Sequence, residues 1–150
     1  MWIQQVITSF IASAAFGILF NAPRTSLVKC GFVGMVGWMI YFVLVEYKVD
    51  VIIATYAAAF FIAFISQFFA RRYKTPIIIF SVAGIIPLVP GGLAYDAMRN
   101  IVSNEYTFAI ESAVKVFLIS GAIAIGLVSS EVVNQVIRKI QYRRQEKVQG

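Results

Sequence analysis

Residues 84–99 contain the chain's most unusual set of backbone-shaping and polar side chains. These are Gly84, Pro87, Pro90, Gly91, Gly92, Tyr95, Asp96 and Arg99. Each proline removes a backbone hydrogen bond, and the glycine pair permits dihedral angles that other residues avoid. A helix broken here exposes carbonyl groups and starts again at a new N-terminus, whose N–H groups and dipole favour a carboxylate. The spacing therefore predicts a binding site for a small polar solute.

The sequence does not decide the roles of the polar residues after the break. Tyr95, Asp96 and Arg99 would lie in the first turns of the second half-helix. Asp96 could bind an amine or a proton, but aspartate is also ordinary at the start of a helix and could pair with Arg99. The whole segment could also be a packing kink, or a span that ends near Val89 before an external loop.

Composition excludes several other kinds of chemistry. The chain has no His and a single Cys, Cys30, so the usual zinc sites and an internal disulfide are ruled out, and we expect no metal and no cofactor. A Ser or Cys nucleophile would lack its imidazole base, and the seven acidic residues form no recognisable pair. No nucleic-acid recognition module accompanies the basic residues. We therefore expect the chain to be neither an enzyme nor a nucleic-acid-binding protein.

The elements that must position the broken segment are membrane helices. Hydrophobic residues make up 60% of the chain, charged residues 13%, and the mean hydropathy is +0.82. Charges separate uncharged stretches of 23, 16, 20, 21 and 15 residues, against about 20 needed to cross a bilayer. The sequence predicts one all-α domain, a polytopic bundle of about five helices whose fourth is broken within residues 76–100. The expected spans are residues 2–20, 30–45, 51–70, 76–95 and 114–133, followed by a basic cytoplasmic tail, 134–150.

The depth of the break makes it informative. Counted from the start of the fourth span at about 1.5 Å per residue, Pro87 would lie roughly 18 Å and Pro90 roughly 22 Å along the helix. In a hydrocarbon core about 30 Å thick, both lie at or beyond the midplane. Unpaired backbone at that depth is tolerated only beside protein or a water-filled cavity, so the break should be sheltered.

Lys and Arg sort into alternate loops, which predicts the orientation. The loops near residues 20–29 and 71–74 and the tail hold ten of the 13 basic residues. Cytoplasmic loops retain such an excess, so we expect an external N-terminus, a cytoplasmic C-terminus and an odd number of spans. A fourth segment that re-entered the cytoplasm would place the basic tail outside, against this pattern.

Small residues mark two helices for close packing. Gly31, Gly34 and Gly37 recur in the second span, and Ala122 and Gly126 lie four apart in the last. Membrane helices use such residues to approach one another, although glycine is also common in spans generally. Glu111 and Lys115 fit an ordinary surface pair.

Several runs of residues together resemble a known family. They are Phe20-Asn21-Ala22-Pro23-Arg24, Gly37-Trp38, Ala70-Arg71-Arg72 with Lys74 and Pro76, and Gly84 to Gly92 (GIIPLVPGG) with Tyr95. They resemble the threonine/serine exporter family over nearly the whole chain. The match is to the small single-domain subunit of its two-gene form, equivalent to the C-terminal half of one-chain members.

The resemblance implies a function and a partner. It implies a proton-driven exporter of the bacterial inner membrane that works with a larger multi-span subunit. Its solutes would be threonine and serine, or dicarboxylates such as succinate. We therefore expect a secondary-transporter subunit that exports small carboxylate-bearing metabolites. The alternative is a non-transporting membrane partner that stabilises or localises the larger subunit, and a homo-oligomer is left open.

Overall fold

The computed structural model describes the backbone of residues 2–149 and the side chains of residues 2–143, so the side chains of Arg144 and Lys147 in the basic tail lie outside the described residues. Its elements are α1 (Trp2–Leu19), η1 (Arg24–Ser26), α2 (Leu27–Glu46), α3 (Val51–Tyr73), α4 (Ile77–Ile85), η2 (Ile86–Leu88), α5 (Gly91–Val102) and α6 (Tyr106–Gln149). Residues 2–149 contain helices and connecting loops without a strand, which confirms the predicted all-α class.

Four helices are long and apolar enough to cross a membrane. They are α1, α2 with its preceding turn, α3 and α6. A fifth span results if the bent pair formed by Ile77–Leu88 and Gly91–Val102 counts as one crossing. The expectation of a polytopic bundle with about five spans and a broken fourth helix is confirmed. The limits of each span within the bilayer stay a prediction.

The last helix is much longer than the stretch that suggested it. We placed a span at residues 114–133 by reading between charges, whereas α6 has 44 residues. Charged side chains do not interrupt it, because Glu111 accepts a hydrogen bond of 2.7 Å from Lys115 one turn later and both point outward. At about 1.5 Å per residue α6 is about 66 Å long, roughly twice the hydrocarbon core of a bilayer.

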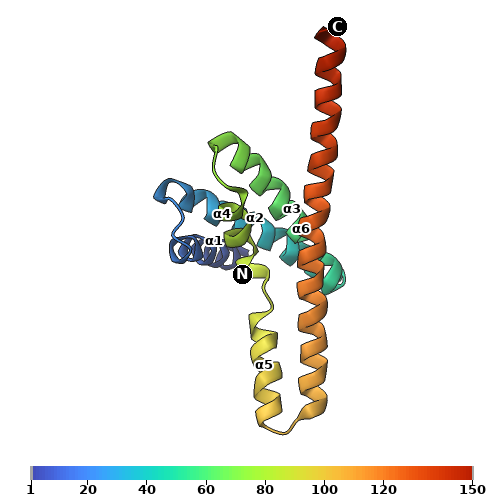
Figure 1. Cartoon of the computed structure of the whole chain (residues 1–150). Helices are drawn as coiled ribbons and strands as arrows, with labels where there is room; N and C mark the ends of the chain where they lie inside the picture. Colours follow the sequence, from blue (N-terminus) through green and yellow to red (C-terminus); the bar gives the residue numbers. More distant parts are fainter. Residues whose placement is uncertain (1, 150) are drawn as a thin grey trace.

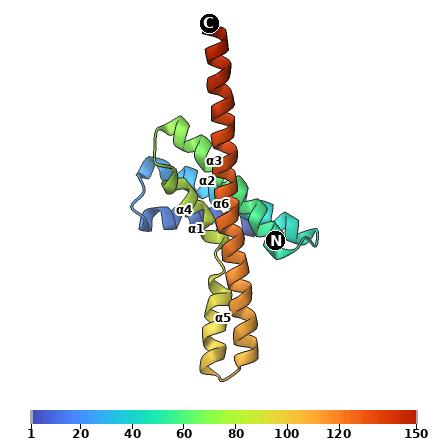
Figure 2. The ribbon, with the colours of Figure 1, turned by 45° about the vertical axis from the view of Figure 1, so that its right-hand side comes forward.

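Figures 1 and 2 show α6 as a straight helix that crosses the group formed by α1 to α4 and extends beyond it in both directions. α5 runs back along the first part of α6, so the two form a hairpin that projects from the group. Within the group, α2 packs against α1, α3 and α4. The buried core includes Cys30, Val33, Ala58, Ala59, Ile62, Phe80, Ala83 and Leu88.

The three glycines of α2 face two different neighbours. A Cβ added at Gly31 would lie 2.8 Å from the ring of Phe10, and one at Gly34 would lie 1.7 Å from Ser13 Oγ, both on α1. A Cβ added at Gly37 would lie 2.3 Å from Ile62 on α3. Steps of three residues turn an α-helix by about 300°, so the series moves around α2 from one partner to the next.

The helix ends gather the basic residues on one side of the molecule. α3 and α6 run in the same direction where they meet. Gly126 lies against Tyr56 of α3, and Glu131 and Asn134, later in α6, bond to Gln67 and Arg71, later in α3. Lys29 Nζ lies 3.3 Å from the ring centre of Tyr73, so α2 begins where α3 ends. We call this side the basic end; its members are Arg24, Lys29, Arg71, Arg72, Lys74, Arg138, Lys139 and Arg143. Its location on the cytoplasmic side stays a prediction.

Candidate functional site

The predicted break lies between α4 and α5. α4 tightens into the 3-10 turn η2, which contains Pro87 and ends at Leu88. Val89 is extended, with φ −63° and ψ 127°, and α5 begins at Gly91. The helix axis bends by 53° across this point. The second half-helix therefore starts at the glycine pair, as the sequence indicates.

This single chain shelters only the first half of the break. Gly84 and Leu88 are buried, and a Cβ added at Gly84 would lie 2.7 Å from Val33 and 2.9 Å from Ile62. Val89 is 51% exposed, and nothing lies within 4 Å of a Cβ added at Gly91 or Gly92. The Gly91 N–H donates to the carbonyl of Val89 at 2.8 Å, and both glycines are exposed, so the start of α5 is open to whatever surrounds the chain.

The first half of the break meets a polar face of α1. Pro87 lines a groove of about 200 Å³ together with Gln5, Thr8, Ser9 and Ala12 of α1 and Trp38 of α2. Trp38 Nε1 donates a hydrogen bond of 2.8 Å to Gln5 Oε1. Thr8 Oγ1 and Ser9 Oγ each donate to a carbonyl one turn earlier at 2.7 Å, which leaves their lone pairs available as acceptors. Sequence reasoning missed this face, although the spacing of Gln5, Ser9 and Ser13 at four residues signals it.

The polar face continues inward to Ser13. Its side chain is fully buried, and its Oγ has no hydrogen-bond partner. It lies at Gly34, where α1 and α2 approach closely and Gly84 of α4 adjoins. An unpaired hydroxyl is costly in an apolar interior, so Ser13 is a polar point inside the bundle, one turn beyond Ser9 of the groove.

The polar residues after the break are directed elsewhere. Asp96 and Arg99 line a second groove, of about 700 Å³, between α5 and α6, whereas Tyr95 is 67% exposed. Among the described side chains, Glu111 and Lys115 form the one ion pair with an N–O distance within 4 Å. Asp96 and Arg99 therefore do not form an ion pair. The structure therefore separates Asp96 from the groove at Pro87.

A third polar group joins α3 to α6. Gln67 Nε2 donates to Glu131 Oε2 at 2.9 Å, and Gln135 Nε2 donates to the other carboxylate oxygen at 3.2 Å. Gln67 is 5% exposed, and its Oε1 has no partner; the buried hydroxyls of Ser66 and Ser130 also have none. The sequence analysis singled out neither Gln67 nor Glu131. Their separation of 64 residues hides the contact from inspection of the sequence.

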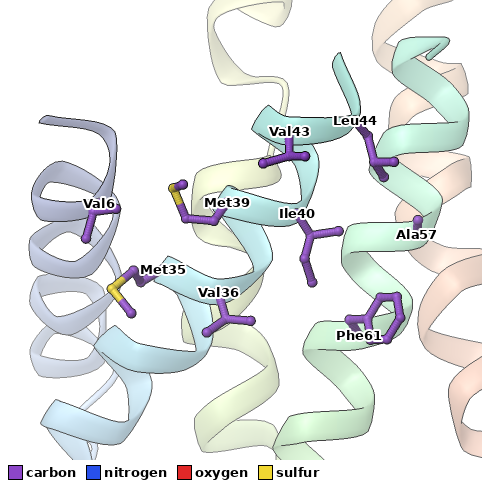
Figure 3. A pocket seen from close by; sticks show the side chains of 9 residues that line it. All are labelled: Val6, Met35, Val36, Met39, Ile40, Val43, Leu44, Ala57 and Phe61. Atoms are coloured by element: carbon purple, nitrogen blue, oxygen red, sulfur yellow. The ribbon is translucent and has the colours of Figure 1, made fainter. Parts of the chain in front are cut away.

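A third groove is lined by apolar side chains. This groove of about 550 Å³ lies along α2, between Val6 of α1 and Phe61 of α3. Figure 3 shows the side chains that line it. Its other lining side chains are Met35, Val36, Met39, Ile40, Val43, Leu44 and Ala57. These side chains carry only carbon and sulfur atoms, so the groove suits acyl chains or an apolar helix rather than a zwitterion.

Comparison with known proteins agrees with the resemblance noted above. The sequence profile described as "Threonine/Serine exporter, ThrE" matches residues 5–133. A Haemophilus influenzae protein described as uncharacterized is 29% identical over 133 residues, covering 83% of this chain and 45% of the relative. A Corynebacterium glutamicum "Threonine/serine exporter" is 25% identical over 135 residues, covering 90% of this chain and 27% of the relative. The chain thus spans less than half the length of these relatives. No solved structure matches it.

The matched region contains the features that shape this molecule. It runs from the polar face of α1, through the break, to the crossing of α3 and α6 at Glu131. It covers most of a chain whose helices are long and apolar enough for a membrane. The chain therefore belongs to the threonine/serine exporter family.

Proposed function

We propose that the chain is a subunit of a secondary transporter that exports small carboxylate-bearing metabolites such as threonine and serine. Membership of the exporter family supports a role in transport. The relative from Corynebacterium glutamicum is described as a threonine/serine exporter, which supports this choice of solute. The observation that carries the proposal is the groove in which Pro87 faces the polar side of α1.

The two halves of the break offer complementary chemistry to a zwitterion. The groove supplies hydroxyl and amide oxygens from Thr8, Ser9 and Gln5, which can accept from an ammonium or hydroxyl group. The start of α5 supplies backbone N–H groups and the positive end of the helix dipole, which suit a carboxylate. At about 30 Å³ per water, a groove of 200 Å³ holds several waters or one small metabolite.

The open half of the break supports a partner. The start of α5 at Gly91 and Gly92 would be exposed to lipid, and lipid cannot satisfy the N–H groups that a helix start leaves without an acceptor. The chain also spans less than half of its relatives' length. We infer that a larger multi-span subunit of the family covers the glycine pair and completes the path. The transport unit would lie in the bacterial inner membrane, with this chain's N-terminus outside.

Glu131 is the carboxylate that we propose to link export to the proton gradient. It lies in the expected last span, where its own side chain is exposed at the surface of this single chain, and it accepts a hydrogen bond from the buried Gln67. Ionisable groups at membrane depth are costly and serve transport when they persist. Glu131→Gln should therefore lower efflux driven by a pH gradient but leave solute exchange without a gradient intact. The matched control is Glu111→Gln, which removes an exposed carboxylate of the same helix.

Substitution of the glycine pair tests the site directly. Gly91→Leu and Gly92→Leu should abolish efflux of loaded threonine or serine while the protein still inserts into the membrane. Folding should not suffer, because a Cβ fits at both positions. Gly121→Leu is the matched control, since a Cβ fits there too, on the uninterrupted helix α6 rather than in the break. Unchanged efflux from cells with normal amounts of the Gly91 and Gly92 variants would reject the site.

A non-transporting partner is the second candidate. The apolar groove of Figure 3 favours it, because an apolar helix of a larger subunit could lie there. The two candidates differ when the larger subunit is expressed alone: efflux at the full rate supports the second, and loss of efflux supports the first.

A further inference from the structure

The basic end contains a groove that is separate from the break and from the α3–α6 carboxylate. It has a volume of about 290 Å³ and is lined by Arg71 of α3 and by Arg138, Gln141 and Tyr142 of α6. Two cationic side chains from different helices thus share one groove, and none of its lining residues is acidic. The nearby carboxylate of Glu131 is hydrogen bonded to two amides.

One of the two guanidinium groups is held in place. Arg71 Nη2 donates to Asn134 Oδ1, and Asn134 is only 8% exposed. A guanidinium has five N–H donors, so this bond leaves others free. The planar fork of arginine fits the oxygens of phosphate, and a fixed fork loses less entropy on binding than a free one.

Exposed apolar side chains lie one helical turn before two of the residues that line the groove. Phe68, one turn before Arg71, is 62% exposed, and Ile137, one turn before Gln141, is 37% exposed. Lys29 over the ring of Tyr73 combines a cation with an aromatic ring at the same end of the bundle, a combination suited to the headgroup layer. A ligand that fits both parts carries a phosphate and an apolar chain.

We propose that the groove between Arg71 and Arg138 binds the phosphate of an anionic phospholipid, with its acyl chains along Phe68 and Ile137. Basic pockets between membrane helices recognise headgroups in this way. Free phosphate could bind the same two arginines but has no acyl chain to contact Phe68 and Ile137. A lipid bound here contacts both α3 and α6 and holds their crossing at one depth in the membrane. The proposal does not depend on the transported solute.

The test uses the full chain purified in a neutral detergent. Its unfolding temperature is followed while phosphatidylglycerol is added in mixed micelles, with phosphatidylcholine and inorganic phosphate as separate arms. Phosphatidylglycerol should raise the unfolding temperature saturably, and the other two should not. Arg138→Gln should weaken the apparent affinity about fivefold, since one basic residue near an anionic surface contributes about 1 kcal/mol. Lys139→Gln removes the same charge from the next position, which does not line the groove, and should leave the affinity unchanged.

Other outcomes overturn the proposal. Equal weakening by Arg138→Gln and Lys139→Gln would show diffuse attraction to charge rather than a site. Equal stabilisation by inorganic phosphate would show an anion site without a lipid. No saturable effect of phosphatidylglycerol would remove the site altogether. Arg71→Lys keeps the charge but loses the fork, so retained affinity in this variant would contradict the role of the held guanidinium.

Discussion

Replacing Gly126 by alanine should separate α6 from α3. The new Cβ would lie 2.8 Å from the carbonyl oxygen of Tyr56, 3.0 Å from Ala59 Cβ and 3.2 Å from the backbone nitrogen of Phe60. Ordinary contact begins at 3.4 Å, so the shortfall at the carbonyl is 3.4 − 2.8 = 0.6 Å. Two of these three neighbours are backbone atoms, so no side chain can rotate away. Overpacking of this kind costs about 1–3 kcal/mol.

Gly121 provides the matched control on the same helix. Nothing lies within 4 Å of a Cβ added there, and alanine is preferred to glycine within a helix by about 0.5–1 kcal/mol. Unfolding of both variants can be followed by circular dichroism in detergent micelles as sodium dodecyl sulfate is added. Gly126→Ala should unfold earlier than the parent, and Gly121→Ala at the same point or later. Equal stability of the two variants would refute the close approach of α6 to α3.

Three further predictions concern single contacts. Trp38→Phe removes the donor to Gln5 and should cost about 1 kcal/mol of stability, measured by the same titration. Asp50→Ala removes the side chain that caps the start of α3 and should cost about 0.5–2 kcal/mol, whereas Asp50→Asn should restore most of this. The hydrogen bond from Lys115 holds the pKa of Glu111 below its usual range, so this pair stabilises the fold at neutral pH and ceases to do so as pH falls through that lowered pKa. Lys115→Gln should raise the Glu111 titration midpoint in carboxyl NMR, and an unchanged midpoint would contradict this cause.

Local chemistry determined what the sequence could predict. Pro87, Pro90 and the glycines after them disrupt a helix wherever they occur, so the break and the start of α5 were predicted correctly. Long uncharged stretches likewise require a membrane whatever their packing. The end of α6 could not be placed in this way, because a charged residue marks a change of solvent more reliably than the end of a helix.

Contacts between distant residues were beyond the sequence. Pro87 meets Gln5 and Trp38 only because α4 packs beside α1 and α2. Glu131 and Gln67 meet only because α6 crosses α3 at Gly126. In each case the residue types were visible, but their partner depended on how the helices pack. The same reason explains why Asp96, four residues after Gly92, turned out to line a different groove from Pro87.

The uninterrupted length of α6 has a mechanical consequence. The crossing at Gly126 lies about 30 Å from the first residue of α6 and about 35 Å from its last, at 1.5 Å per residue. Gly126 thus divides α6 into two parts of nearly equal length. A rotation of α6 by 10° about this point moves each tip by roughly 5–6 Å, in opposite directions. Displacement of the α5–α6 hairpin at one surface of the membrane would therefore move the C-terminal end of α6 at the other surface, without any bending of the helix.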